Sequence, residues 1–164
     1  MELKGYPVIP PIYMTATYKF DNSDDLIDVV QSNSGYIYSR WNNPSVEQVE
    51  RALADLEGYA QAWGFGSGMA AISTAVLAHV GSGDRIVTTR EIYGGTFELM
   101  ETVLPALGVA VTYVNCWKTH EILAEIDRGL TVLYLESPTN PLLRVVDVRT
   151  LSDAAHAKGA TVLL

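Results

Sequence analysis

The sequence predicts an α/β domain built on a mostly parallel β-sheet with helices on both faces. Short apolar runs alternate with helical patterns from about residue 60 to the last residue. The runs are rich in β-branched residues and lack a polar face, as strands buried on both sides require. The segments between them are long enough for the crossover connections of parallel strands. Together these observations favour a sheet between two layers of helices.

Residues 1–44 are expected to form an extended arm. Pro7, Pro10 and Pro11 stand there among many aromatic residues, and no period of 2 or 3.6 is sustained. Such a segment cannot build a core of its own, so we expect another surface to cover it. Residues 45–164 are then expected to form the first part of a larger domain.

A helix is predicted directly after Pro44. Ser45 and Gln48 have the spacing of a capping box, and Gly58 is placed to end the helix. The segments that follow are expected to be strands and helices in turn. Strands are predicted at residues 60–65, 85–89, 109–114, 131–135 and 161–164, and helices at about 68–80, 96–107, 119–126 and 147–158.

Several boundaries of these elements depend on single residues. Thr119 and Asp147 are expected to cap helix starts, and Gly159 follows a helix end where a left-handed backbone is common. Pro105 is expected to weaken the last turn of its helix because it has no amide hydrogen. The final strand, Thr161–Leu164, has no polar tail, so we expect the domain to be truncated.

Charge and composition argue against several classes of protein. A net charge of −8 disfavours binding to nucleic acid, which needs clustered Lys and Arg. The longest nearly apolar stretch, Met69–Val80, is too short to span a bilayer, so a cytoplasmic protein without membrane contact is expected. Cys116 is the only cysteine, and the three histidines lack metal-ligand spacing. No metal site is predicted.

The candidate binding loops follow the predicted strands, because ligands of open parallel sheets bind beyond the carboxyl ends of the strands. The first loop, Gly64–Met69, leads into a helix, and its glycines and free amides favour a phosphate. The same loop has two other interpretations. It can be a glycine turn shaped for packing alone, or Gly66–Ala71 can be a dinucleotide-binding fingerprint with Glu91 as the ribose-binding acid.

Three further segments carry candidate ligand-binding residues. Glu91–Thr96 offers the Tyr93 ring and two glycines, against which a flat cofactor could stack. Glu136–Pro141 offers a carboxylate and the Asn140 amide between two prolines, although a plain proline-bounded turn has the same composition. Arg40, close to Tyr38, can hold a phosphate with paired donors or can be an exposed surface cation.

Five short motifs stand in the chain in a fixed order: Pro10-Pro11-Ile12-Tyr13, Tyr38-Ser39-Arg40 with Asn43-Pro44-Ser45, Ser67–Ile72, Tyr93–Thr96 and Glu136–Pro141. In this order they resemble the trans-sulfuration (Cys/Met metabolism) family of pyridoxal-phosphate-dependent enzymes. The resemblance covers essentially the whole chain and corresponds to the amino-terminal part of such an enzyme. It implies the large domain of a fold-type-I pyridoxal-phosphate transferase, here truncated.

The resemblance also implies roles for individual residues. Pyridoxal 5'-phosphate is the expected cofactor, with its phosphate held by the amides of Gly68 and Met69. The Tyr93 ring is expected to stack on the pyridine and is a candidate acid or base. Asn140 is expected near the phenolic oxygen of the ring, with Glu136 supporting that region.

Members of the family form homotetramers made of active dimers. The resemblance therefore implies that Tyr38 and Arg40 reach the cofactor phosphate of a neighbouring subunit, so that residues 1–44 contact that subunit. It also implies that the Schiff-base lysine and the acid that pairs with the pyridine nitrogen are absent from these 164 residues. Lys4, Lys19, Lys118 and Lys158 do not stand in the expected sequence context.

The implied activity is elimination or replacement at Cβ or Cγ of sulfur-containing or O-acylated amino acids. The expected type is cystathionine gamma-synthase, cystathionine gamma-lyase or O-acetylhomoserine sulfhydrylase. Methionine gamma-lyases typically carry cysteine where Gly95 stands, which disfavours that specialised activity. Two alternatives stay open: an incomplete, inactive fragment of such an enzyme, and a dinucleotide-binding module that uses Gly66–Ala71.

Overall fold

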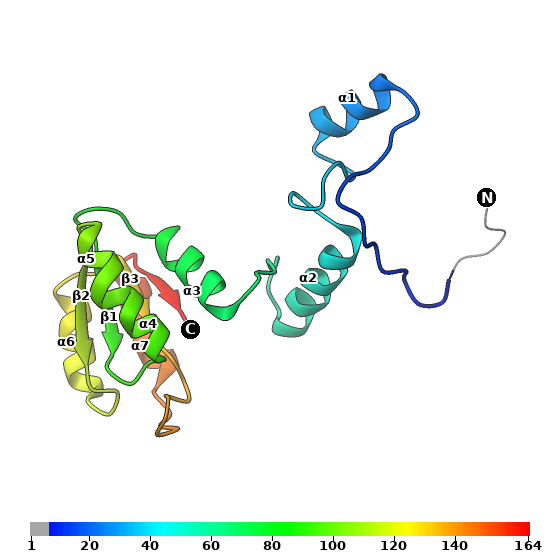
Figure 1. Cartoon of the computed structure of the whole chain (residues 1–164). Coiled ribbons are helices and arrows are strands. Elements are labelled where there is room, and N and C mark those ends of the chain that lie inside the picture. Colours follow the sequence, from blue (N-terminus) through cyan, green and yellow to red (C-terminus); the bar gives the residue numbers. More distant parts are fainter. Residues whose placement is uncertain (1–6) are drawn as a thin grey trace. The chain divides into compact units, whose positions relative to one another are not determined.

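The computed structural model describes residues 7–164, so Lys4 and Tyr6 lie outside the described residues. The chain divides into two compact units, Met1–Gly64 and Phe65–Leu164, shown in Figure 1. The second unit contains the β-sheet. Each unit is described by itself.

The second unit is built on a parallel sheet of four strands in the order β2-β1-β3-β4. The strands are β1 (Arg85–Thr89), β2 (Ala110–Val114), β3 (Val132–Tyr134) and β4 (Thr161–Leu163), coloured from green to red in Figure 1. All four were predicted to within two residues at each end. The predicted parallel α/β fold is confirmed.

Helices cover both faces of this sheet. One face packs against α6 (Thr119–Asp127) and α7 (Val148–Ala157). The other packs against α3 (Gly68–Leu77) and a continuous helical segment formed by α4 (Gly94–Glu98), the π-helix η1 (Leu99–Val103) and α5 (Leu104–Ala106). The strands supply alternate residues to the two cores. In β3, for example, Val132 and Tyr134 pack on the α3 side and Leu133 on the α6 side.

The helix ends show which capping predictions were right. The Asp147 carboxylate accepts a hydrogen bond from the Thr150 amide, and Gly159 has a φ of 75° after α7, so both boundary predictions are confirmed. The prediction for Thr119 was wrong, because Lys118 occupies the cap position of α6. The predicted 96–107 helix starts at Gly94 and contains a π turn just before Pro105, which tolerates a residue without an amide hydrogen.

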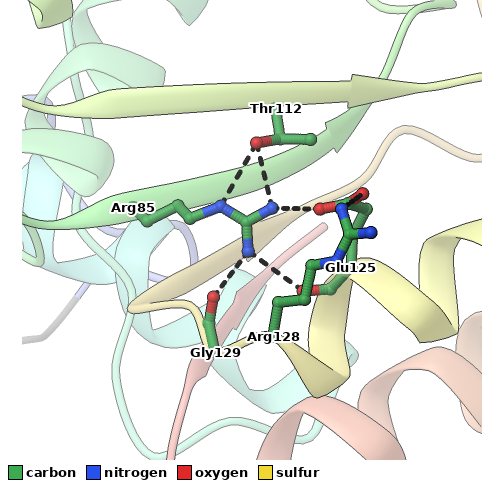
Figure 2. Close-up of polar contacts among 5 residues, drawn as sticks. All are labelled: Arg85, Thr112, Glu125, Arg128 and Gly129. Atoms are coloured by element: carbon green, nitrogen blue, oxygen red, sulfur yellow. Dashed lines mark hydrogen bonds and ion pairs between the residues drawn. The ribbon is translucent and has the colours of Figure 1, made fainter.

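Arg85 ties the amino end of β1 to the end of α6 (Figure 2). Its guanidinium donates to the carbonyl oxygens of Glu125 at 3.0 Å and Gly129 at 2.6 Å, and to the Thr112 hydroxyl at 3.0 Å. It also pairs with the Glu125 carboxylate, which Arg128 contacts at 2.6 Å. The arginine thereby satisfies carbonyls that the end of a helix leaves without partners. It stabilises the edge of the sheet opposite the strand carboxyl ends.

The first unit contains two helices, α1 (Ser23–Ser32) and α2 (Pro44–Glu57). The sequence analysis did not predict α1, whose start is capped by the Asn22 side chain at 2.8 Å from the Asp25 amide. The predicted capping box of α2 was also wrong. Asn43 is the cap residue, and the Ser45 hydroxyl instead accepts a hydrogen bond from the Tyr13 amide at 2.9 Å. Gly58 ends α2 with a φ of 72°, as predicted.

Residues 60–65 do not form the predicted strand. A strand is stabilised by backbone pairing with a neighbour, and none of the strand pairs among the described residues includes this segment. Trp63 is 70% exposed, so the apolar run is not buried in a core either. The prediction failed because an apolar run alone does not specify its pairing partner.

The apolar side of α2 is uncovered in the first unit. Ala54 is the one buried residue of this helix, and the exposed apolar side chains are Val46, Val49, Leu53 and Leu56. Several residues of the preceding segment, among them Ile12 and Met14, are exposed as well. No helix in residues 7–164 is long and apolar enough to cross a membrane.

Candidate functional site

The candidate site lies where the strand order of the sheet reverses. The chain runs from β1 outward to β2, then returns past β1 to β3 and β4. Connections therefore leave the carboxyl ends of β1 and β3 in opposite directions, and a crevice opens at such a switch point. The loops after these two strands are Arg90–Tyr93 and Leu135–Pro141, which carry the predicted residues Tyr93, Glu136 and Asn140.

Glu136 joins the two loops across the switch point. One of its carboxylate oxygens accepts a hydrogen bond from the Tyr93 amide at 2.8 Å, and the other accepts one from the Tyr134 hydroxyl at 3.1 Å. Tyr93 follows β1 and Tyr134 lies in β3, so the carboxylate bridges neighbouring strands. The structure thus brings Tyr93 and Glu136 together, at the edge where parallel strands place their ligand loops.

The start of α3 presents free backbone amides. Ser67 caps the helix by accepting hydrogen bonds from the Ala70 amide at its hydroxyl and from the Ala71 amide at its carbonyl, both at 3.1 Å. The amides of Gly68 and Met69 have no acceptor within residues 7–164. A Cβ added at Gly68 would meet nothing within 4 Å. Two unsatisfied amides at a helix start, with free space beside the Cα of Gly68, suit an anion.

Met69 connects the start of α3 to the start of α4. The Thr96 hydroxyl donates a weak hydrogen bond to the Met69 sulfur at 3.9 Å. A Cβ added at Gly95 would lie 3.0 Å from that sulfur and 2.7 Å from Cε1 of the Tyr93 ring. Gly95 therefore leaves the space in which the Tyr93 ring packs, beside the helix start that carries the free amides.

Asn140 lies in an ordered loop after β3. Thr139 is fully buried, and its hydroxyl accepts a hydrogen bond from the Arg144 amide at 3.1 Å. The Thr139 amide and the Arg144 carbonyl are also paired, at 2.9 Å. The Asn140 side chain is exposed and makes no hydrogen bond within residues 7–164. The loop thus holds a free amide side chain close in sequence to Glu136.

Tyr38 and Arg40 belong to the first unit, which is described by itself. The Arg40 guanidinium lies 5.0 Å from the centre of the Tyr38 ring. Arg40 is exposed and has no ion-pair partner within residues 7–164. An antiparallel bridge between Tyr38 and Thr17 fixes the backbone here. The guanidinium is held beside an aromatic ring with its donors available to an anion.

The competing dinucleotide interpretation lacks its structural context. That fingerprint requires a strand before the glycine turn, and residues 60–65 are not a strand. Its proposed acid, Glu91, accepts a hydrogen bond from the Cys116 amide at 2.8 Å. Burial, with the Glu91 carboxylate beside it, raises the pKa of the Cys116 thiol.

The described lysines are not placed as cofactor ligands. Lys118 pairs with Glu121 at 2.6 Å, and Lys158 pairs with Asp127 at 3.0 Å. Lys158 comes just before β4, at the amino edge of the sheet, and Lys19 lies in the first unit. Within residues 7–164, no three His, Cys, Asp or Glu side chains gather to hold a metal ion.

The sequence analysis missed Tyr134, and it gave Thr96 no role of its own within the Glu91–Thr96 loop. Tyr134 is 6% exposed, and this burial, together with the Glu136 carboxylate, raises the pKa of Tyr134 to about 12. Thr96 is fully buried. The signal for Tyr134 was its hydroxyl in an otherwise apolar strand, because a buried phenol needs a hydrogen-bond partner.

These residues fit pyridoxal phosphate. The unsatisfied amides of Gly68 and Met69 match the charge and the acceptor oxygens of a phosphate. Tyr93 is 49% exposed, so one part of the ring is packed and the rest is accessible to a flat ligand. The donor set thus suits a ligand that combines a phosphate with an aromatic ring.

Comparisons with known proteins agree with this fit. The family model described as Cys/Met metabolism PLP-dependent enzyme matches residues 4–164. The chain is 40% identical over 154 residues to the chloroplastic cystathionine beta-lyase of Arabidopsis thaliana, covering 94% of this chain and 32% of that protein.

Two solved structures share the fold. The crystal structure of metB from Corynebacterium glutamicum matches with a TM-score of 0.85 and 31% identity, over 95% of this chain and 39% of that one. A putative O-acetylhomoserine (thiol)-lyase from Campylobacter jejuni, solved with a pyridoxyl-lysine monophosphate, matches with a TM-score of 0.82 and 28% identity, over 93% of this chain and 38% of that one. The chain therefore spans 32% to 39% of the length of these relatives.

Proposed function

Because the chain belongs to the Cys/Met metabolism family of PLP-dependent enzymes, we propose that it supplies the cofactor-phosphate and ring-stacking part of an enzyme acting on amino acids. The proposed reaction is elimination or replacement at Cβ or Cγ of a sulfur-containing or O-acylated amino acid. The single observation that carries this proposal is the Glu136 bridge, which holds Tyr93 beside the free amides of α3.

Each residue has a proposed task. The Gly68 and Met69 amides hold the phosphate, and the Ser67 cap keeps the first turn of α3 in place for them. The Tyr93 ring packs on the pyridine, at an orientation that Glu136 fixes through the Tyr93 amide. Asn140 would donate a hydrogen bond to the phenolic oxygen of the cofactor. When bound, pyridoxal phosphate would supply an electron sink for reactions at the substrate Cα.

Tyr93 is also a candidate for moving a proton near the substrate. Its ring is half exposed, so its hydroxyl is accessible to a bound molecule. A tyrosine in such a position can act as acid or base. None of the described lysines is proposed to bond to the cofactor, since two are ion-paired and the third, Lys19, lies in the first unit.

The first unit is proposed to act on a neighbouring subunit. The uncovered apolar side of α2 and the exposed residues before it leave a surface that a second subunit would bury, which supports a homotetramer made of active dimers. Tyr38 and Arg40 would then bind the phosphate of the neighbouring subunit. We also propose a cytoplasmic location. The chloroplastic name of the Arabidopsis relative makes an organelle the alternative to exclude.

The alternative function is that of an incomplete, inactive piece of such an enzyme. The specific observation that favours it is the pairing of Lys118 and Lys158 with carboxylates, which leaves both unsuited to bond to a cofactor aldehyde. A chain of this kind would neither bind the cofactor well nor catalyse the reaction.

The test is reduction of the pyridoxal-phosphate-treated chain with borohydride, followed by intact mass and peptide mapping. We expect no single lysine to be labelled stoichiometrically on this chain of 17.9 kDa. One fully labelled lysine would contradict the proposal that none of these lysines bonds to the cofactor. Binding is measured separately with 4′-deoxypyridoxine phosphate, which has no aldehyde and cannot label lysines. A chain that does not bind this probe would contradict the proposed site.

A further inference from the structure

Tyr134 occupies a distinctive position in the candidate site. It lies at the end of β3 and is buried against the α3 side of the sheet, in the cluster that includes Ile92 and Met100. Glu136 follows the end of β3 by two residues, and its carboxylate faces the Tyr134 hydroxyl. Their hydrogen bond is 3.1 Å long. The intervening residue, Leu135, packs on the opposite face.

The Glu136 carboxylate is fixed at both oxygens. The Tyr134 hydroxyl holds one, and the other accepts from the Tyr93 amide at 2.8 Å. The two partners come from neighbouring strands, since β1 and β3 pair directly. Removing either partner would free the carboxylate to rotate about its side-chain bonds, because Glu136 is itself only partly buried.

We propose that Tyr134 is a positioning residue for the cofactor site: its buried hydroxyl holds Glu136 so that Glu136 fixes the backbone of Tyr93. The inference rests on the proposed function, because it gives Tyr93 the task of stacking on the cofactor ring. A phenol is protonated at neutral pH, and burial raises the pKa of Tyr134 further, to about 12, so the hydroxyl stays a donor to the carboxylate. We call this chain of contacts, from Tyr134 through Glu136 to the Tyr93 amide, the relay. It connects a residue of the sheet core to the loops that form the site.

The chain contains a matched control. Tyr113 in β2 and Tyr134 in β3 are both register partners of Thr88, one on each side of β1. Both pack on the α3 side of the sheet. The Tyr113 hydroxyl is buried and makes no hydrogen bond of normal geometry among residues 7–164, although burial and the nearby Glu101 carboxylate raise the pKa of Tyr113. Tyr113→Phe therefore removes the same atom from the same layer without touching the relay.

The experiment compares Tyr134→Phe, Tyr113→Phe and the unchanged 164-residue chain in two measurements. The first is hydrogen exchange at the Tyr93 amide, resolved by NMR. Loss of one hydrogen bond in the relay is expected to speed this exchange by about two- to tenfold in Tyr134→Phe. Tyr113→Phe is expected to leave it unchanged. Thermal unfolding of each variant verifies that it is folded.

The second measurement distinguishes a positioning role of Tyr134 from a general loosening of the fold in the variant. Affinity is titrated with 4′-deoxypyridoxine phosphate and, separately, with inorganic phosphate, which needs the α3 amides but no ring partner. We expect Tyr134→Phe to weaken the first by about two- to tenfold and to leave the second unchanged. A purely structural role would alter both affinities or neither.

The outcomes are distinguishable. Unchanged Tyr93 exchange in Tyr134→Phe, or an equal change in Tyr113→Phe, would overturn the relay. Faster exchange in Tyr134→Phe alone supports the relay, whether or not the unchanged chain binds 4′-deoxypyridoxine phosphate. Failure of the unchanged chain to bind this probe would overturn the proposed function and not the relay. Glu136→Gln is a second variant in case Tyr134→Phe does not fold, and it is also expected to speed exchange at Tyr93.

Discussion

Replacing Gly95 by alanine tests the proposed stacking of Tyr93 directly. The added Cβ would lie 2.7 Å from Cε1 of Tyr93, and 3.0 Å from the sulfur of Met69. Carbon atoms in contact are about 3.5–4.0 Å apart, so the ring must move by roughly 0.8 Å or more. Tyr93 is 49% exposed, and the ring can therefore turn outward without unfolding the unit.

The expected loss of affinity follows from the aromatic contact that a displaced Tyr93 ring would no longer make. Overpacking costs about 1–3 kcal/mol, and the low end applies because both clashing groups are ends of flexible side chains. A well-oriented aromatic contact is worth about 0.5–1.5 kcal/mol, so a misplaced Tyr93 ring should weaken binding of 4′-deoxypyridoxine phosphate by roughly two- to tenfold. Affinity for inorganic phosphate should stay the same, because the Gly68 and Met69 amides are backbone groups.

The control for this variant is Gly94→Ala. A Cβ at Gly94 would meet nothing within 4 Å, although the residue is adjacent and lies in the same helix. Fluorescence titration gives both affinities, and thermal unfolding gives the stability. Equal affinity of Gly95→Ala and Gly94→Ala for the ring probe would refute the proposed role of Tyr93. We expect Gly94→Ala to bind like the unchanged chain.

Three further predictions concern stability. Arg85→Met should lower the free energy of unfolding, measured in urea, by about 2–3 kcal/mol; the loss is limited because Arg128 still pairs with Glu125. The exposed control Arg149→Met should change it by less than about 0.5 kcal/mol. Equal losses in the two variants would contradict the proposed role of Arg85. Burial raises the pKa of Tyr134 from 10.0 to about 12, so the stability contribution of this group, roughly 3 kcal/mol, is complete below pH 10 and is lost as pH rises through 12. The free energy of unfolding of Tyr134→Phe should therefore fall less steeply between pH 10 and 12 than that of the unchanged chain. An unchanged slope would contradict this prediction. The Thr150 hydroxyl and amide lower the pKa of Asp147 below its usual 3.8, so this carboxylate stabilises the fold above that pH and the contribution is lost on acidification. In Asp147→Asn the free energy of unfolding should fall less steeply on acidification than in the unchanged chain. An equally steep fall would refute the stabilising role of the Asp147 carboxylate.

The parallel sheet could be predicted because its signal is local. Buried parallel strands are apolar throughout, so β1 and β3 could be identified from their own residues. Their adjacency could not be predicted, since no local pattern states which strands pair. For the same reason residues 60–65 were wrongly assigned to a strand. The helix α1 was missed although Asn22 caps it and Asp24 and Asp25 occupy its first turn.

The candidate site shows the same division between local and nonlocal information. The free amides at Gly68 follow from a glycine turn before a helix, which the sequence displays. The contact between Glu136 and the Tyr93 amide joins residues 43 positions apart and depends on strand order. Tyr134 was read as part of an apolar run, so its hydroxyl escaped notice. Local patterns thus located the loops, and the pairing of β1 with β3 determined how they meet.

The most direct test of the proposed cofactor site is an NMR titration of the 164-residue chain with 4′-deoxypyridoxine phosphate. We expect the largest saturable shifts at the amides of Gly68, Met69 and Tyr93 and at the Asn140 side chain. Inorganic phosphate should shift the first two and leave Tyr93 and Asn140 nearly unchanged. Saturable shifts confined to other residues, or none at all, would contradict the assignment of this edge of the sheet as the pyridoxal-phosphate site.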